Sequence, residues 1–355
     1  MKKQEKTFRI LIIRFSSIGD IVLTSPVTRH LRKIYPKAEL DYLTKTEYAP
    51  LAQALPGVDH VVSFEIPNGI WALSARLRRK SYDLVVDLHG SIRSRLVTLL
   101  TNGNQVVRYN KQRVTRIALI ASNRNKRSWE INHTVDRYLD IINKLGDGEI
   151  LPIAKTYLSE IDRLPQLIVK KSISIEIMNS LTKAGIKPES SIVGIAPSAS
   201  HSTKRWRPDY FAIVADYLVE VHGMTILLLG GADDSIVTKK VVSAMKTSAL
   251  NWFGRTNLMQ LAAAIKQCRI LISNDSGPMH IATAVGTPAL GIFGSTHPQL
   301  GFAPLGPQDT MVSLNLPCSP CSLHGDRVCR FGTQACLEDL SPQHIINEIE
   351  NRYFA

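Results

Sequence analysis

The segment after a short apolar run at residues 269–273 combines the residue types that bind an anion. Asp275, Ser276 and Gly277 lie at the expected start of a helix over 278–285. Free backbone N–H groups and the helix dipole favour a phosphate at such a start. A carboxylate repels phosphate, so Asp275 is better suited to a ribose hydroxyl or a base. The segment suggests a nucleotide diphosphate site, although a plain capped helix has the same pattern.

Polar side chains follow other strands that we expect in the second half of the chain. Ligands of open parallel sheets bind beyond the carboxyl ends of the strands. Lys204 is a natural counter-charge for a diphosphate, or else a solvated surface lysine. Asp233 follows two glycines at a strand end, where it either approaches a ligand or caps the next helix. His280 either faces a phosphate or lies in the core. The polar residues selected in this half are Ser198, Ser200, Lys204, Asp233, Asp275, Ser276, Gly277 and His280.

Asp20 is the residue of the first half best suited to acid–base chemistry. It follows Ser16, Ser17 and Gly19 in the loop after an apolar strand at residues 8–14. A carboxylate at a helix start stays ionised, so Asp20 is a candidate general base if it faces a ligand. The alternative is an aspartate that only stabilises its helix. A transferase that attacks an anomeric carbon needs such a base, together with positive charge or dipoles for the leaving diphosphate.

Strands and helices alternate along both halves of the chain, which predicts parallel α/β sheets. The first loop lacks the G-x-G-x-x-G pattern of a dinucleotide fold, so a nicotinamide or flavin enzyme is not expected. We expect two Rossmann-like domains that face a central cleft. The expected boundaries are a first domain over 1–165, a linker region over 166–190, a second domain over 191–340 and a helix over 341–355 that packs back on the first domain.

The charge is unevenly distributed. The chain of 355 residues has a formal net charge of +13. Residues 1–150 hold 25 Lys and Arg against 14 Asp and Glu, a net +11, which leaves +2 for the remainder. This asymmetry predicts a polyanionic partner of the first half, either nucleic acid or the headgroups and phosphorylated glycolipids of a membrane. A merely solubilising surface remains the alternative, and no nucleic-acid-binding motif supports the first option.

Two further features bear on location and metals. No apolar run approaches the roughly 20 residues of a membrane helix, and the first residues lack the pattern of a signal peptide, so a cytoplasmic protein is expected. Four cysteines near the end of the chain permit a thiolate zinc site, although only one Cys-x2-Cys pair is present. Free thiols and a disulfide are the other options. These cysteines are Cys318, Cys321, Cys329 and Cys336.

Several separated motifs together resemble glycosyltransferase family 9, the ADP-heptose:lipopolysaccharide heptosyltransferases, and most closely its second-heptosyltransferase branch. The similarity extends over roughly residues 8–340. The motifs that carry it lie at residues 9–26, 82–90, 204–206, 273–280, 286–288 and 317–321.

The resemblance implies a GT-B fold and an inverting enzyme that needs neither a metal nor another cofactor. It assigns Asp20 as the catalytic base, Lys204 as the diphosphate lysine, and the segment from Asp275 to His280 as the nucleotide-sugar loop. The first domain then binds the acceptor and the second binds the donor. The acceptor-binding residues that we expect are Arg14, Ser16, Ser17, His89 and Arg93.

Three departures from the family pattern leave the exact donor contacts open. Arg14 stands where some members have lysine, Asp233 replaces a glutamate, and the serines at 198 and 200 replace two threonines. The expected function is transfer of heptose from ADP-heptose to an anionic lipopolysaccharide precursor. The enzyme is expected to be monomeric and peripherally bound at the cytoplasmic face of the inner membrane, without nucleic acid. Alternatives are a GT-B enzyme for another nucleotide sugar and surface glycan, a GT-B epimerase, or a basic nucleic-acid-binding protein.

Overall fold

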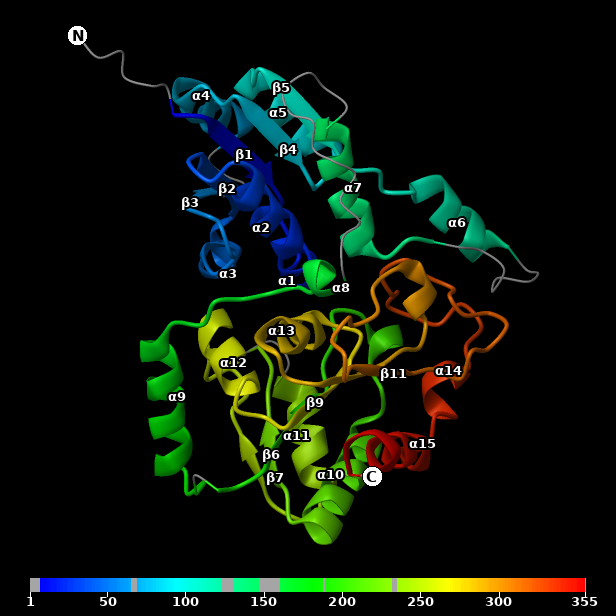
Figure 1. Cartoon of the computed structure of the whole chain (residues 1–355). Coiled ribbons are helices and arrows are strands. Elements are labelled where there is room, and N and C mark those ends of the chain that lie inside the picture. Colours follow the sequence, from blue (N-terminus) through cyan, green and yellow to red (C-terminus); the bar gives the residue numbers. More distant parts are fainter. Residues whose placement is uncertain are drawn as a thin grey trace. The chain divides into compact units, whose positions relative to one another are not determined.

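The structure, a computed structural model of the chain, describes residues 7–64, 69–122, 131–146, 160–187, 189–231 and 235–354. The chain forms two compact units, each with its own parallel β-sheet (Figure 1). The first unit comprises Met1–Lys111 and Thr134–Ile168, and the second comprises Gln112–His133 and Val169–Ala355. Two α/β units with parallel sheets confirm the predicted fold class.

The described residues of the first unit form five strands in the order β3-β2-β1-β4-β5. Its central strand is a continuous apolar run, as expected for a strand covered on both faces, and Ile10 to Ile13 are completely buried. The strands are β1 (Arg9–Ile13), β2 (Glu39–Lys45), β3 (His60–Phe64), β4 (Leu84–Asp87) and β5 (Gln105–Arg108). The helices are α1 (Ile18–Val22), α2 (Ser25–Ile34), α3 (Ala49–Gln53), α4 (Ile70–Lys80), α5 (Ile92–Thr101), α7 (Thr134–Gly146) and α8 (Glu160–Arg163).

In the second unit, the part of the chain that the structure describes forms six strands in the order β11-β10-β9-β6-β7-β8. The strands are β6 (Ile192–Ala196), β7 (Thr225–Leu228), β8 (Ala249–Asn251), β9 (Ile270–Asn274), β10 (Ala289–Ile292) and β11 (Thr310–Val312). The helices are α6 (Arg113–Ala121), α9 (Lys171–Lys183), α10 (Pro208–His222), α11 (Ser235–Ala244), α12 (Leu258–Ile265), α13 (Gly277–Val285), α14 (Ala335–Glu338) and α15 (Pro342–Ile349). Gly286, with φ +82°, ends α13 in the left-handed conformation that glycine adopts without strain, as its position predicts.

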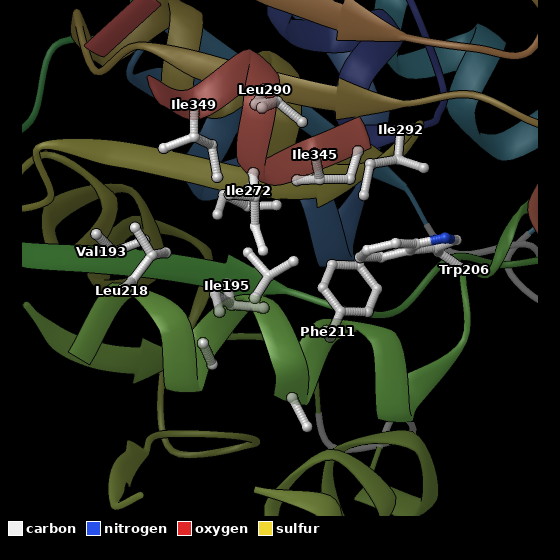
Figure 2. Close-up of a cluster of buried hydrophobic side chains, with 14 of the residues drawn as sticks. Val193, Ile195, Trp206, Phe211, Leu218, Ile272, Leu290, Ile292, Ile345 and Ile349 are labelled. Carbon is white, nitrogen blue, oxygen red and sulfur yellow. The ribbon is translucent and has the colours of Figure 1, made fainter. Parts of the chain in front are cut away.

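One face of the second sheet packs on α10 and α15 through a large hydrophobic core (Figure 2). Ile195 and Ile272 of the sheet meet Phe211 of α10 there, and the Trp206 side chain is completely buried beside Phe211. The indole nitrogen of Trp206 donates to the carbonyl of Leu340 at 2.8 Å, which satisfies its one polar group. This core fixes the loop that precedes α10, in which Lys204 lies.

The C-terminal helix belongs to this core, so its expected packing on the first domain is wrong. Ile345 and Ile349 of α15 are completely buried in the cluster that also contains Leu290 and Ile292 (Figure 2). The physical reason is the amphipathic pattern of α15, whose apolar stripe is covered by α10 and the adjacent sheet. The sequence shows such a stripe but not the surface that it covers.

The segment around α6 also joins the second unit, although the predicted first domain included it. The guanidinium of Arg116 lies 5.2 Å from the centre of the Phe302 ring. The His133 imidazole Nε2 lies 2.9 Å from the carbonyl oxygen of Ala303. These contacts link the segment to residues at least 170 positions later in the chain. Within the described ranges, no helix is both long and apolar enough to cross a membrane.

Candidate functional site

Asp20 lies in the first unit on α1, directly beyond the carboxyl end of β1. Its Oδ2 lies 2.7 Å from Nη2 of Arg14 and accepts a hydrogen bond from the hydroxyl of Ser17 at 2.9 Å. The Asp20 side chain is 20% exposed, whereas that of Arg14 is 8% exposed. An opposite charge at this distance favours the carboxylate. The structure therefore combines an ionised carboxylate with access from solvent, as a general base requires.

The Arg14 side chain is held by three separate acceptors. Besides Asp20, its Nε donates to the Ser16 carbonyl and its Nη1 to the Leu88 carbonyl, both at 2.7 Å. Burial disfavours the guanidinium charge, but Asp20 and the neighbouring tyrosines outweigh it and raise the pKa of Arg14 above its usual value. Arg14 is thus a permanent cation fixed against Asp20. Arg14, Ser16, Ser17 and Asp20 thus contact one another beyond the carboxyl end of β1.

Two tyrosines complete this cluster, and the sequence gives no local signal for either. Tyr138 Oη donates to Oδ1 of Asp20 at 3.3 Å, and the ring of Tyr109 lies 4.8 Å from the ring of Tyr138. Burial raises the pKa of both hydroxyls above the ordinary tyrosine value, so each remains a neutral donor. Tyr138 lies 118 positions after Asp20, and only packing of α7 brings it to this place.

The loop after β4 is organised by Asp87, another residue that the sequence did not single out. Asp87 is completely buried and accepts from the amides of His89 and Gly90 and from the hydroxyl of Ser94, at 2.8–3.0 Å. Burial, and then the charges of Arg14 and Lys111, lower the pKa of His89 to about 3. His89 is therefore a neutral imidazole near Arg14 at physiological pH. Arg93, the other predicted residue of this loop region, is exposed at the start of α5.

Lys204 and Asp275 form the central pair of the second unit. The Lys204 Nζ lies 2.8 Å from Oδ2 of Asp275, and the two side chains are 14% and 9% exposed. The hydroxyl of Thr296 also donates to Oδ2 at 2.6 Å. The structure thus brings together the predicted lysine and the predicted carboxylate. The lysine charge offsets the carboxylate that would otherwise repel a phosphate beside the start of α13.

The start of α13 follows β9 and has the features of an anion site. Ser276 is the N-cap residue, and its side chain makes no capping hydrogen bond to the helix. Its hydroxyl instead lies 3.1 Å from the hydroxyl of Ser273. The first backbone N–H groups of α13 therefore have no side-chain cap and can face a ligand. His280, one turn into the helix, is 4% exposed.

The remaining predicted residues of this unit have different positions. Ser198 is buried, and its hydroxyl has no hydrogen-bond partner among the described residues. Ser200 is exposed. Asp233 lies outside the described residues. Asn274, which was not predicted, accepts from the amide of Trp206 at 3.0 Å and donates to the carbonyl of Pro197 at 2.7 Å. It therefore holds both ends of the segment between β6 and α10 that carries Ser198 and Lys204.

A loop near Gly325 packs against the stem of Lys204. Gly325 has φ +90°, and a Cβ at this position would lie 2.8 Å from Cγ and Cδ of Lys204. The next amide, that of Asp326, donates to the hydroxyl of Thr203 at 2.8 Å. Only glycine therefore fits against the lysine in this conformation. The sequence does not reveal the contact, because more than 100 residues separate the two segments.

The four C-terminal cysteines line one small cavity of about 30 Å³. Among the described residues, no group of three or more His, Cys, Asp and Glu side chains has the arrangement of a metal site. Burial raises the pKa of Cys336 to about 12, and the other three thiols contribute. The predicted alternatives of a zinc site and a disulfide are thus not found among the described residues.

The fold and the two clusters define the class of protein. Two α/β units with parallel sheets, one with a carboxylate beyond β1 and the other with a lysine beside a helix start, are the components of a GT-B glycosyltransferase. The sequence profile of glycosyltransferase family 9 (heptosyltransferase) matches residues 70–330. The chain therefore belongs to this family and is a glycosyltransferase, as its motifs predict.

Individual relatives agree with this assignment. The lipooligosaccharide heptosyltransferase 2 of Haemophilus influenzae is 28% identical over 323 residues, which cover 86% of this chain and 88% of the relative. The ADP-heptose lipopolysaccharide heptosyltransferase II of Escherichia coli has a similar structure, with a TM-score of 0.72, 24% identity and coverage of 97% and 98%. A family 9 glycosyl transferase from Veillonella parvula gives a TM-score of 0.74 at 20% identity, with coverage of 97% and 96%.

Proposed function

We propose that this protein transfers a heptose from ADP-heptose to the inner core of a lipopolysaccharide precursor, with inversion at the anomeric carbon. The names of its relatives support the donor and the acceptor. We further propose that it acts as a monomer at the cytoplasmic face of the inner membrane. The single observation that carries the chemical part is the Asp20 carboxylate, held by Arg14 and still accessible to solvent.

Asp20 would act as the general base on the acceptor. Its Oδ2 is bound by Arg14 and Ser17, while Oδ1 has the longer contact of 3.3 Å with Tyr138. An acceptor hydroxyl can therefore approach at Oδ1. Arg14 keeps the carboxylate charged before the reaction and lies beside the acceptor site as a fixed cation. Together with Arg93 and the neutral His89, it supplies groups that suit a phosphorylated or carboxylated sugar.

The second unit would bind the donor and stabilise the leaving group. Cleavage of the bond between the anomeric carbon and the diphosphate oxygen leaves a negative charge on ADP. We assign stabilisation of that charge to the Lys204 ammonium and the N–H groups at the start of α13, and their position next to each other supports this. Before the donor binds, the Asp275 carboxylate is paired with Lys204. When the lysine turns to the diphosphate, this carboxylate becomes available to a sugar or ribose hydroxyl.

The proposed reaction is a single displacement. The proton of the acceptor hydroxyl moves to Asp20 as the hydroxyl oxygen forms a bond to the anomeric carbon. The carbon–oxygen bond to the diphosphate breaks, and its electron pair leaves with ADP. Because the new bond forms on the face opposite the leaving group, the configuration inverts. The proton acquired by Asp20 is then lost to solvent.

A panel of ADP-, UDP- and GDP-sugars tests the donor. We expect ADP-heptose to raise the thermal midpoint of the protein and to release ADP only when a heptose-deficient inner-core acceptor is added. Mass spectrometry of the acceptor should show the gain of one heptose residue. Stabilisation and turnover with a UDP-sugar, but not with ADP-heptose, would instead favour another glycan-forming enzyme. Salt-sensitive DNA binding without any sugar transfer would favour the nucleic-acid alternative.

A further inference from the structure

Helices α4 and α5 of the first unit share one outward surface. Both helices bury their inner sides on the same face of the sheet, since Leu73 and Leu77 of α4 lie in one core cluster with Val97 of α5 and with residues of β1. The two helices also contact each other, and Nε of Arg78 donates to the carbonyl of Leu100 at 3.0 Å. Their opposite sides must therefore face solvent together.

Large apolar side chains lie on this outward surface. Trp71 is 71% exposed, Ile92 is 88% exposed and Leu99 is 73% exposed. Neither Trp71 nor Ile92 is needed to cover the core, because each lies in the first turn of its helix with its side chain in water. Several exposed large apolar residues on one pair of helices indicate an interaction surface. Tryptophan in particular suits the boundary between water and lipid.

The same two helices carry only positive charge. The sequences of α4 and α5 contain no Asp or Glu, and Arg79 and Arg95 are exposed on them. A surface that combines exposed arginines with large apolar groups complements an anionic bilayer, because lipid phosphates attract the cations and the interface accepts the apolar groups. Nucleic acid would pair with the arginines but would leave Ile92 and Leu99 in water.

We propose that this α4–α5 surface, formed by Trp71, Arg79, Ile92, Arg95 and Leu99, binds the protein to an anionic lipid bilayer. The inference rests on the proposed function and extends it by naming the surface that meets the membrane. Since α5 begins three residues after His89, the surface adjoins the loop to which we assign acceptor binding. Docking through α4 and α5 would hold this loop beside the headgroup of a lipid-anchored acceptor.

Sedimentation of the full-length protein with vesicles tests the proposal. We expect binding to vesicles of phosphatidylcholine with 30% phosphatidylglycerol and little binding to phosphatidylcholine alone. The double variant Arg79→Gln/Arg95→Gln should bind anionic vesicles about 30-fold more weakly, from the loss of two surface cations. Trp71→Gln/Leu99→Gln should weaken binding at least about tenfold through lost apolar burial. Ile213→Gln/Ile236→Gln alters exposed apolar residues of the second unit and should bind like the unchanged protein.

Turnover without vesicles separates this proposal from the proposed function. All three variants should transfer heptose to a deacylated, water-soluble acceptor at the unchanged rate, which also shows that they are folded. If the unchanged protein transfers heptose to the soluble acceptor but does not bind anionic vesicles, the docking surface is overturned while the proposed function is not. Equal vesicle binding by the α4–α5 variants, or equal loss in the Ile213/Ile236 control, would overturn it too. A dimer that Trp71→Gln/Leu99→Gln dissociates, without vesicle binding, would assign the surface to a second copy. Absence of any transfer would instead count against the proposed function.

Discussion

Replacing Asp20 by asparagine separates the chemical role of the carboxylate from its structural role. Removal of one partner from a fully buried ion pair costs about 3–5 kcal/mol. Asp20 keeps 20% exposure, and the amide oxygen of asparagine can still accept a hydrogen bond from Arg14. We therefore expect a smaller loss, about 2 kcal/mol in the free energy of unfolding of the first unit. For a unit of this size, the thermal midpoint should fall by roughly 6 °C.

The effect on turnover should be much larger than this loss of stability. An amide cannot accept the proton of the acceptor hydroxyl, and loss of a general base slows reactions by about 10²- to 10⁴-fold. Because the variant remains folded below its lowered midpoint, kcat should fall by that factor at 20 °C. The affinity for ADP should stay within about twofold, since the donor-binding residues that we assign lie in the second unit.

Stopped-time assays of ADP release, with calorimetry of ADP binding, measure the two effects independently. Asp136→Asn is a matched control, because Asp136 forms a two-point ion pair with Arg163 in the same unit, at 2.6 and 2.7 Å. This control should lose some stability but keep its kcat. If Asp20→Asn retained more than a tenth of the unchanged kcat, Asp20 would not be the base. If it lost ADP binding as well, its role would be structural.

Two further predictions concern single residues. Gly325→Ala and Gly332→Ala both place a side chain at positive φ, so each should cost about 1–2 kcal/mol of stability. Only the new side chain of Gly325→Ala presses on Lys204, so calorimetry should show weaker ADP binding for that variant alone. Equal ADP affinities of the two variants would refute a role of the Gly325–Lys204 contact in ADP binding. For His89, the folded pKa of about 3 lies below the ordinary 6.5. As the pH drops from 7 to 5, His89 therefore takes up a proton in the unfolded chain but not in the folded protein. Over this range the free energy of unfolding should fall by about 1–2 kcal/mol more in the unchanged protein than in His89→Gln. Urea unfolding at both pH values checks this, and parallel pH dependences would contradict it.

Much of the fold follows from local sequence patterns. The apolar run at Ile10 to Ile13 and the alternation of strands and helices predict parallel sheets, and the structure contains two. The end of α13 at Gly286 follows from the same kind of reasoning, since glycine adopts positive φ without strain. Periodicity and turn residues act over a few positions, so one sequence is enough to read them.

Contacts between distant segments could not be predicted in this way. The sequence shows that α15 is amphipathic, but not that Ile345 and Ile349 meet the second sheet rather than the first unit. It also gives no reason to assign the segment around Arg116 to the second unit, where the side chain meets Phe302. Such choices depend on which surfaces match in shape and apolar area, and that property belongs to the folded chain.

The same distinction between local sequence patterns and distant contacts applies to the candidate site. The sequence by itself selects Asp20, Lys204 and Asp275 as candidate site residues, because these charged groups follow the carboxyl ends of expected parallel strands. Only the tertiary structure decided their partners. Arg14 and Tyr138 enclose Asp20, and Lys204 is paired with Asp275. Charge and hydrogen bonding depend on distances of a few ångströms. The Arg14–Asp20 pair is local, but the other two contacts exist only after segments more than 70 residues apart have packed together.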